Sequence, residues 1–119
     1  REMRYAARLG TVAPPLAELA ALDDAAFRER FSGSPIKRIG RAKFLRNVLT
    51  AVGNSAVTSL VPRVENLLTD ESPLVRGSAV WALAQLTDAD AFDDLRARHE
   101  QIESDSVVLG EWSRQSTVI

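Results

Sequence analysis

The chain has 119 residues, enough for one ordinary domain, and its 45% hydrophobic and 26% charged residues with a net charge of −1 are typical of a globular protein. No stretch approaches the roughly 20 consecutive apolar residues that span a bilayer, so we expect no membrane partner. Cysteine is absent, which excludes disulfides and cysteine-ligated zinc or iron–sulfur sites within these residues.

The part of the chain before residue 40 predicts short helices separated by breaks. Residues 1–13 have helical propensity without a start signal, and because the sequence begins with no leader we expect them to connect to something upstream. Pro15 suits the first turn of a helix, either Asp23 or Asp24 suits an N-cap, and Ser34 can cap a single turn before Gly40. The corresponding helical segments are residues 16–22, 25–31 and 35–38.

From residue 41 onward the sequence predicts one helix after another. Pro62 is tolerable only in a first turn, which places one helix start near Leu60, and Gly53 marks the end of the helix before it. Ser72 and Pro73 are a cap and a first helical residue. The expected helices cover residues 41–52, 60–68, 74–86, 91–102 and 107–114. Nothing alternates with period two over a strand's length, so the predicted class is all-α.

Similar segments recur about every 30 residues. Residues 51–54 resemble residues 82–85, and residues 71–75 resemble residues 103–107. Residues 70–83 combine an acidic turn, a proline, a Val-Arg pair and a small-residue helix, which resembles a HEAT-like repeat. We therefore predict a HEAT-like α-solenoid of antiparallel helix pairs over residues 41–119, preceded by a connecting segment over residues 1–40.

The sequence also predicts contacts for three residues of the repeats. Arg76 can reach back to Asp70 or forward to the next acidic turn. Trp81 and Trp112 are expected to pack in the core or between repeats, and the alternative for them is a stacking role in binding.

Little in the chain predicts catalysis. His99 is the only histidine, which excludes a metal site or a catalytic group built on two histidines. Its place late in a predicted helix indicates a solvated residue or one at the helix end. The glycines match no nucleotide-binding fingerprint, and we expect no catalytic residue and no metal site.

Charge is distributed unevenly along the chain. Residues 1–63 carry 11 Lys/Arg against 5 Asp/Glu, a net charge of +6, whereas residues 64–119 carry 4 against 11, a net charge of −7. This polarity favours a polyanionic partner for the basic end. The alternative is that the basic half faces the acidic half or another domain.

A basic cluster is the most informative feature for function. Cations at the predicted helix start, Arg41 and Lys43, oppose the helix dipole, so a compensating gain such as contact with backbone phosphates is expected. Arg46 aligns with Arg76 in the repeat, which leaves a structural role open for it. The candidate nucleic-acid-binding residues are Lys37, Arg38, Arg41, Lys43 and Arg46.

Residues 30–55, with Gly33-Ser-Pro-Ile-Lys-Arg38 and Leu45-Arg-Asn47, resemble the C-terminal part of the epoxyqueuosine reductase family. The resemblance covers residues 13–86 and weakens beyond them. It implies a cytoplasmic, tRNA-modifying oxidoreductase of queuosine biosynthesis, with cobalamin and two [4Fe–4S] clusters in its upstream cobalamin-binding and ferredoxin-like domains.

For this chain the resemblance implies a non-catalytic part of the parent enzyme that helps to bind the tRNA substrate. The basic segment from Ser34 to Asn47 then faces either tRNA or the upstream domains. An alternative from another class is a HEAT-like protein-interaction scaffold with no nucleic-acid role. Steep salt dependence of binding distinguishes the first function from the second.

Overall fold

The computed structural model describes residues 15–116, and every regular element in that range is an α-helix or a short 3-10 helix. The all-α prediction is therefore confirmed for these residues. Predictions that concern residues 1–13 lie outside the described range. None of the described helices is long and apolar enough to cross a membrane.

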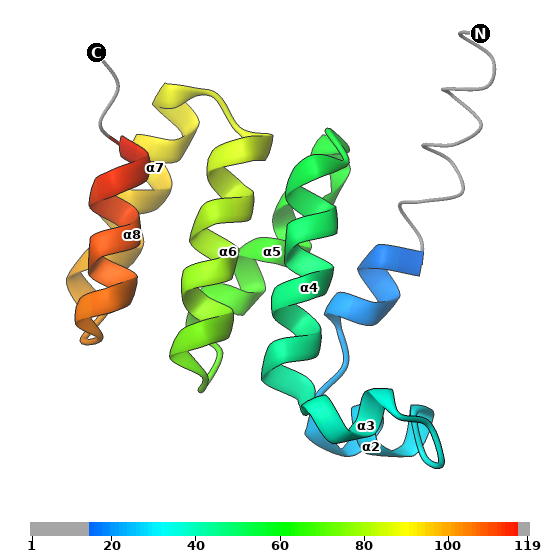
Figure 1. Ribbon diagram of the computed structural model, residues 1–119. Coiled ribbons are helices and arrows are strands. Elements are labelled where there is room, and N and C mark those ends of the chain that lie inside the picture. The colour runs from blue at the N-terminus through cyan, green and yellow to red at the C-terminus, as the bar shows by residue number, and fades with distance from the viewer. Residues whose placement is uncertain (1–14, 117–119) are drawn as a thin grey trace, which may run out of the picture.

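The repeat region is built in two layers (Figure 1). The helices α4 (Arg41–Asn54), α6 (Pro73–Leu86) and α8 (Ser106–Ser116) stand side by side, with α5 (Val61–Asn66) and α7 (Ala89–His99) behind them. Short 3-10 helices, η1 (Thr58–Leu60), η2 (Leu67–Thr69) and η3 (Glu100–Ile102), join the layers. This is the predicted HEAT-like arrangement of helix pairs.

The central helix α6 is buried on several sides because neighbours flank it within its own layer and cover it from behind. Val75, Ala79 and Leu83 have no exposed surface. Leu45, Leu49 and Val52 of α4 are likewise fully buried and belong to the same hydrophobic core. The nearly all-round apolar sequence of residues 74–86 is explained by this central position.

Close contact between α4 and α6 depends on a glycine. A Cβ built on Gly53 would lie 2.5 Å from Cζ3 of Trp81. The sequence predicted a helix over residues 41–52 that stops at Gly53 and Asn54, but α4 continues two residues further and ends at Asn54. Gly53 itself is a buried residue of the last helical turn, and its missing side chain lets the indole approach.

Capping residues read from the sequence mostly sit where they were predicted. The Asp23 carboxylate accepts a hydrogen bond from the Ala26 amide at 2.8 Å and caps α2 (Asp24–Arg30). Ser72 caps α6, with Pro73 as its first residue. The helix predicted at residues 91–102 begins earlier, at Ala89, because Asp88 caps it, and its last turn is the 3-10 helix η3.

Three phenylalanines pack together where the short N-terminal helices meet the repeat region. Phe27 of α2 and Phe31 beyond it pack on Phe44 of α4, with ring centroids 4.9–5.2 Å apart. This cluster holds α2 and the one-turn helix α3 (Ile36–Ile39) at the foot of α4 (Figure 1). The N-terminal end of α4 is therefore part of a packed corner of the molecule.

Candidate nucleic-acid interface

The basic residues converge at this corner, where α3 turns into α4. The turn is made by Gly40, whose φ of 83° is unfavourable for residues with a side chain. It places Lys37 and Arg38 on α3 next to the first turns of α4, which carry Lys43 and Arg46. All four of these side chains are exposed. We call Lys37, Arg38, Lys43 and Arg46 the basic surface.

No carboxylate within residues 15–116 forms an ion pair with the basic surface. The Arg46 side chain makes only hydrogen bonds of 3.3 Å to the side-chain oxygen of its neighbour Asn47. Lys43 lies in the first turn of α4, which contains no acidic residue to offset the helix dipole. The folded chain therefore leaves these charges available to a partner.

A shallow hollow of about 530 Å³ opens beside α3. Its lining is formed by the turn before the helix and by the two cations of the helix: Gly33, Ser34, Pro35, Lys37 and Arg38. The Ser34 hydroxyl accepts a hydrogen bond from the Ile36 amide at 3.2 Å, which fixes the turn. The hollow is thus lined by a hydrogen-bonded turn and by two charged groups.

The side chain of Arg41, the fifth predicted contact residue, is not part of the basic surface. Its Nη2 is 2.7 Å and its Nη1 3.3 Å from the carboxylate of Asp70, and its Nε donates to the Leu22 carbonyl at 2.7 Å. The Arg41 and Asp70 side chains are only 13% and 10% exposed. Arg41 is therefore a link between α4, the segment before α2 and the turn before α6.

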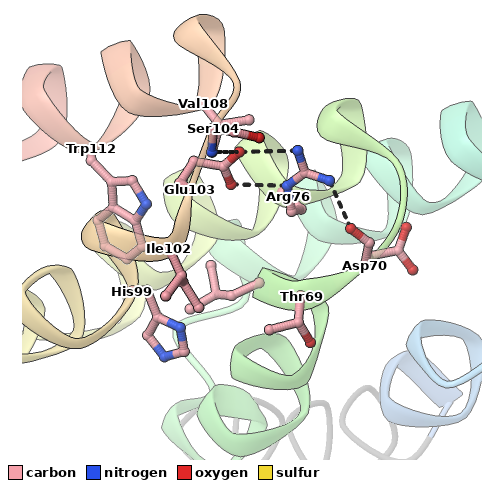
Figure 2. Close-up of a pocket in the computed structure, with 10 residues that line it drawn as sticks. Thr69, Asp70, Arg76, His99, Ile102, Glu103, Ser104, Val108 and Trp112 are labelled. Carbon is pink, nitrogen blue, oxygen red and sulfur yellow. Dashed lines mark hydrogen bonds and ion pairs between the residues drawn. The ribbon is translucent and has the colours of Figure 1, made fainter.

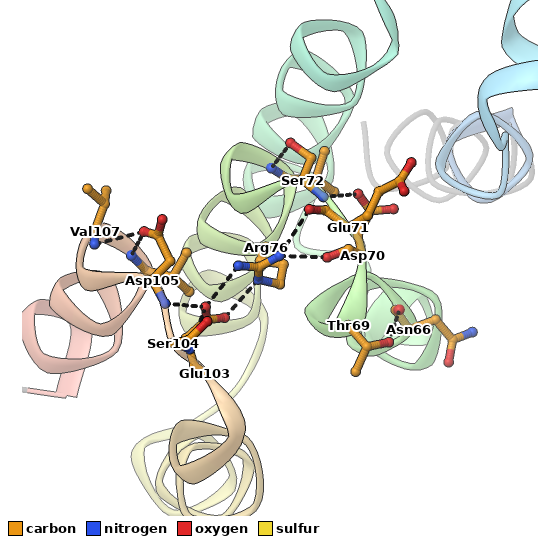
Figure 3. Close-up of polar contacts among 12 residues, drawn as sticks. Asn66, Thr69, Asp70, Glu71, Ser72, Arg76, Glu103, Ser104, Asp105 and Val107 are labelled. Carbon is orange, nitrogen blue, oxygen red and sulfur yellow. Dashed lines mark hydrogen bonds and ion pairs between the residues drawn. The ribbon is translucent and has the colours of Figure 1, made fainter.

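The same type of link recurs one repeat later, around Arg76. Its Nε and Nη2 donate to the two carboxylate oxygens of Glu103 at 2.8 and 3.0 Å, and its Nη1 donates to the Asp70 carbonyl at 2.9 Å (Figure 3). The sequence predicted that Arg76 reaches either Asp70 or the next acidic turn, and in the structure it reaches both. Arg46, which aligns with Arg76 in sequence, makes no such link, and Arg41 does instead.

The Arg41–Asp70 and Arg76–Glu103 pairs, joined by the bond from Arg76 to the Asp70 carbonyl, form a ladder across the repeats, and both of its carboxylates are held ionised. Burial alone would raise the pKa of Asp70, but hydrogen bonds from Arg41 and from the Ser72 amide, with the two arginine charges, outweigh it and lower the pKa. Burial acts likewise on Glu103, where hydrogen bonds from Arg76 and two backbone amides lower the pKa below its usual value. The ladder is a charged frame that fixes α4, α6 and α8 in register.

A second hollow, of about 310 Å³, lies below this ladder (Figure 2). His99, at the end of α7, lies on its wall, with its ring parallel to that of buried Trp112 at 6.5 Å and its Nε2 3.4 Å from Glu65. The prediction of a helix-end position is correct, but the side chain is only 17% exposed instead of solvated. No group of three metal-ligating side chains occurs among residues 15–116.

Two structural features were not predicted from the sequence. The pairing of Arg41 with Asp70 joins residues 29 positions apart, and the contact of Gly53 with Trp81 joins two helices. The acidic residues in the turns before α6 and α8 were a usable signal, because Asp70 and Glu103 occupy equivalent turns. The expected packing role of both tryptophans is confirmed, since Trp112 is buried and Trp81 is half-buried against α4.

Comparison with known proteins agrees with this architecture. The profile described as HEAT repeats matches residues 40–110. Epoxyqueuosine reductase from Xanthomonas campestris pv. campestris is 41% identical over 71 residues, covering 59% of this chain and 20% of that protein. The Escherichia coli (strain K12) protein of the same name is 36% identical over 73 residues, covering 61% of this chain and 19% of its own length.

A solved structure shows the same fold. The crystal structure of a selenomethionine-labelled epoxyqueuosine reductase superposes with a TM-score of 0.77 at 24% sequence identity, over 85% of this chain and 27% of that chain. Of the curated relatives named above, the chain spans about a fifth of the length.

Proposed function

We propose that this chain, which belongs to the HEAT-repeat family, is a non-catalytic RNA-holding part of an epoxyqueuosine reductase. The premise of the proposal is that the chain is homologous to the HEAT-repeat region of the epoxyqueuosine reductases. In this role the basic surface contacts phosphates of the tRNA substrate. The reductive chemistry is carried out by the other domains of the parent oxidoreductase, which acts in the cytoplasm in queuosine biosynthesis.

One observation carries the proposal: the charge of the basic surface is exposed and forms no ion pair at the corner where α3 meets α4. Lys43 opposes the α4 dipole at a cost of a few tenths of a kcal/mol, and the described fold offers it no carboxylate in return. Arg41 has the same kind of position but is offset by Asp70. A polyanion that binds Lys43 and its neighbours would supply the missing compensation.

The cofactors implied by the family do not fit these residues. The chain contains no cysteine to supply thiolate ligands to an iron–sulfur cluster, and no metal-ligand cluster occurs among residues 15–116. We therefore assign the cobalamin and the two [4Fe–4S] clusters to the upstream domains of the parent protein. Those domains are also proposed partners of this chain.

Salt dependence tests the proposal. The binding of fluorescently labelled tRNA to this chain is measured by anisotropy at several salt concentrations. About four phosphate contacts predict that log K falls against log salt with a slope of about −3 to −4. A slope near zero, or no binding at low salt, would contradict an RNA-holding role.

A second candidate function is a protein-interaction scaffold without a nucleic-acid role. It is favoured by the apolar groups on the face of α4, α6 and α8, where Leu74 and Val107 are 40% and 73% exposed beside half-buried Trp81. An apolar protein interface is much less sensitive to salt than phosphate contacts are. The salt titration therefore separates the two candidates.

A further inference from the structure

We propose that the front face of the repeat region, formed by the exposed sides of α4, α6 and α8, docks an acidic segment of a partner protein. The segment inserts one bulky apolar side chain into a notch on α6 and places a carboxylate against Arg46. The notch is a hollow of about 230 Å³ whose lining includes Thr50, Leu74, Gly77, Ser78, Trp81 and Val107. The inference goes beyond the proposed function and does not depend on tRNA binding.

The exposed side of α6 carries no charge. Arg76 is the only charged residue of this helix, and its guanidinium is bonded within the ladder. Leu74 is 40% exposed on the front face, and Trp81 is half-buried beside it. A surface helix normally turns charged or polar residues to solvent, so an apolar exposed side at the centre of the molecule marks an interaction site.

The notch has the shape of a socket for one side chain. Leu74 and Trp81 are seven positions apart, which places them two turns apart on the same side of α6, with the small residues Gly77 and Ser78 between them. A Cβ built on Gly77 would meet one side-chain atom within 4 Å, Cγ2 of Val108 at 3.9 Å. A leucine or phenylalanine side chain of a partner therefore fits between the two large residues as an anchor.

Positive charge lies next to the notch on the α4 side. The Thr50 hydroxyl, in the lining, donates to the Arg46 carbonyl at 3.0 Å, so the two residues share one side of α4, about 6 Å apart along its axis. The Arg46 side chain is exposed and bonds only to Asn47. Lys43, a further turn towards the start of α4, is also exposed. A partner carboxylate about one helical turn from the apolar anchor meets these cations.

The opposite wall does not repel such a carboxylate. Glu111 of α8 lines the notch there, but its two carboxylate oxygens accept hydrogen bonds from Arg114 at 2.6 Å and from Gln115 at 2.7 Å. The charge of Glu111 is therefore offset within α8. A basic segment would meet Arg46 with a like charge and gain no free carboxylate from this wall, so charge complementarity selects an acidic segment.

The lining also favours a polypeptide over a nucleic acid. Trp81 is the one aromatic residue among the residues that line the notch, and it packs against Gly53 of α4. Its ring therefore lacks the fully exposed face on which a base would stack. An aliphatic or benzyl side chain fills the notch without such a face.

Selection from a library of random peptides displayed on phage tests the inference. We expect enriched peptides to share one bulky apolar residue with Asp or Glu three or four positions away. In a labelled synthetic copy of one of them, replacing the apolar residue by alanine should weaken binding at least about tenfold, and replacing the acidic residue by lysine should weaken it about fivefold. No enrichment, or enrichment of basic peptides, would overturn the inference.

Variants of the chain locate the site. V107E places a carboxylate in the wall of the notch and should reduce the affinity for the synthetic peptide at least about tenfold. I102E is the matched control, because Val107 and Ile102 are both apolar and 73% and 67% exposed but Ile102 lies outside the notch. Both variants are checked by circular dichroism to remain helical. Equal losses in the two, or no loss in V107E, would contradict the assignment.

Reversing the charge of Arg46 tests the second contact. In R46E, selection should enrich Lys or Arg in place of Asp or Glu beside the same kind of apolar residue. An unchanged preference for acidic peptides would overturn the role of Arg46. Because these measurements contain no RNA, their failure leaves the proposed function standing, and a failure of tRNA binding with retained peptide binding would remove the proposed function alone.

Discussion

Removing Arg76 tests the ladder that holds the repeats together. R76A deletes the paired hydrogen bonds to Glu103 and the bond to the Asp70 carbonyl. The Glu103 side chain, 6% exposed in the folded chain, then loses its counter-charge, although the amides of Ser104 and Asp105 still donate to it. The variant therefore leaves a nearly buried charge only partly compensated.

The expected cost follows from this burial. Breaking a buried ion pair by removing one partner costs about 3–5 kcal/mol, and because Glu103 keeps two amide hydrogen bonds we expect the lower end, ~3 kcal/mol. For a domain of this size that loss corresponds to a decrease in melting temperature of about 10–15 °C. Arg28→Ala is the control, since its pair with Asp24 is 68% and 56% exposed and should contribute under about 1 kcal/mol.

Urea unfolding followed by circular dichroism measures both variants. A double-mutant cycle with Glu103→Gln isolates the pairwise energy, which we expect to be about 1.5–3 kcal/mol because the two side chains are in direct contact. If R76A costs no more than R28A, or if the cycle gives a coupling near zero, the ladder does not stabilise the fold as we argue.

Three further predictions follow from the same structure. Because the pKa values of Asp70 and Glu103 are lowered on folding, the unfolded chain binds more protons in acid, and the free energy of unfolding should fall progressively below about pH 4; a stability that is flat from pH 5 to pH 2 would contradict this. Gly53→Ala should destabilise by about 1 kcal/mol, since steric overlap with Trp81 outweighs the gain in helix propensity, and the loss should vanish in a W81L background. Ala56 has a φ of 59°, so A56G should raise the unfolding free energy by about 0.5–1 kcal/mol, and a decrease would show that the loop is unstrained.

Local signals predicted the helices well because caps and prolines act within one turn. Asp23, Ser72 and Pro73 needed no tertiary information, and the helix starts follow from them. The acidic turns on either side of Arg76 were predicted as its alternative partners, and in the structure Arg76 reaches both. The all-α class and the paired architecture followed from the same periodicity.

The register between repeats could not be predicted in the same way. Arg46 and Arg76 are aligned by residue identity, but their side chains do not have equivalent partners. The link to the next acidic turn is made by Arg41, at the beginning of α4. His99 is covered because Trp112 and Glu65 reach it from other elements. Of the five candidate RNA contacts, sequence alone could not separate Arg41, paired inside the fold, from the four exposed residues.

The central claim is that the basic surface holds tRNA, and one comparison tests it most directly. K37A/R38A/K43A/R46A is measured beside R63A/R96A/R98A/R114A, which removes the same number of charges from α5, α7 and α8. Both variants are first checked to remain helical. We predict that the first loses tRNA binding at least about 100-fold at low salt while the second stays within a few-fold of the parent chain. Equal losses in the two variants, or no loss in the first, would contradict the claim.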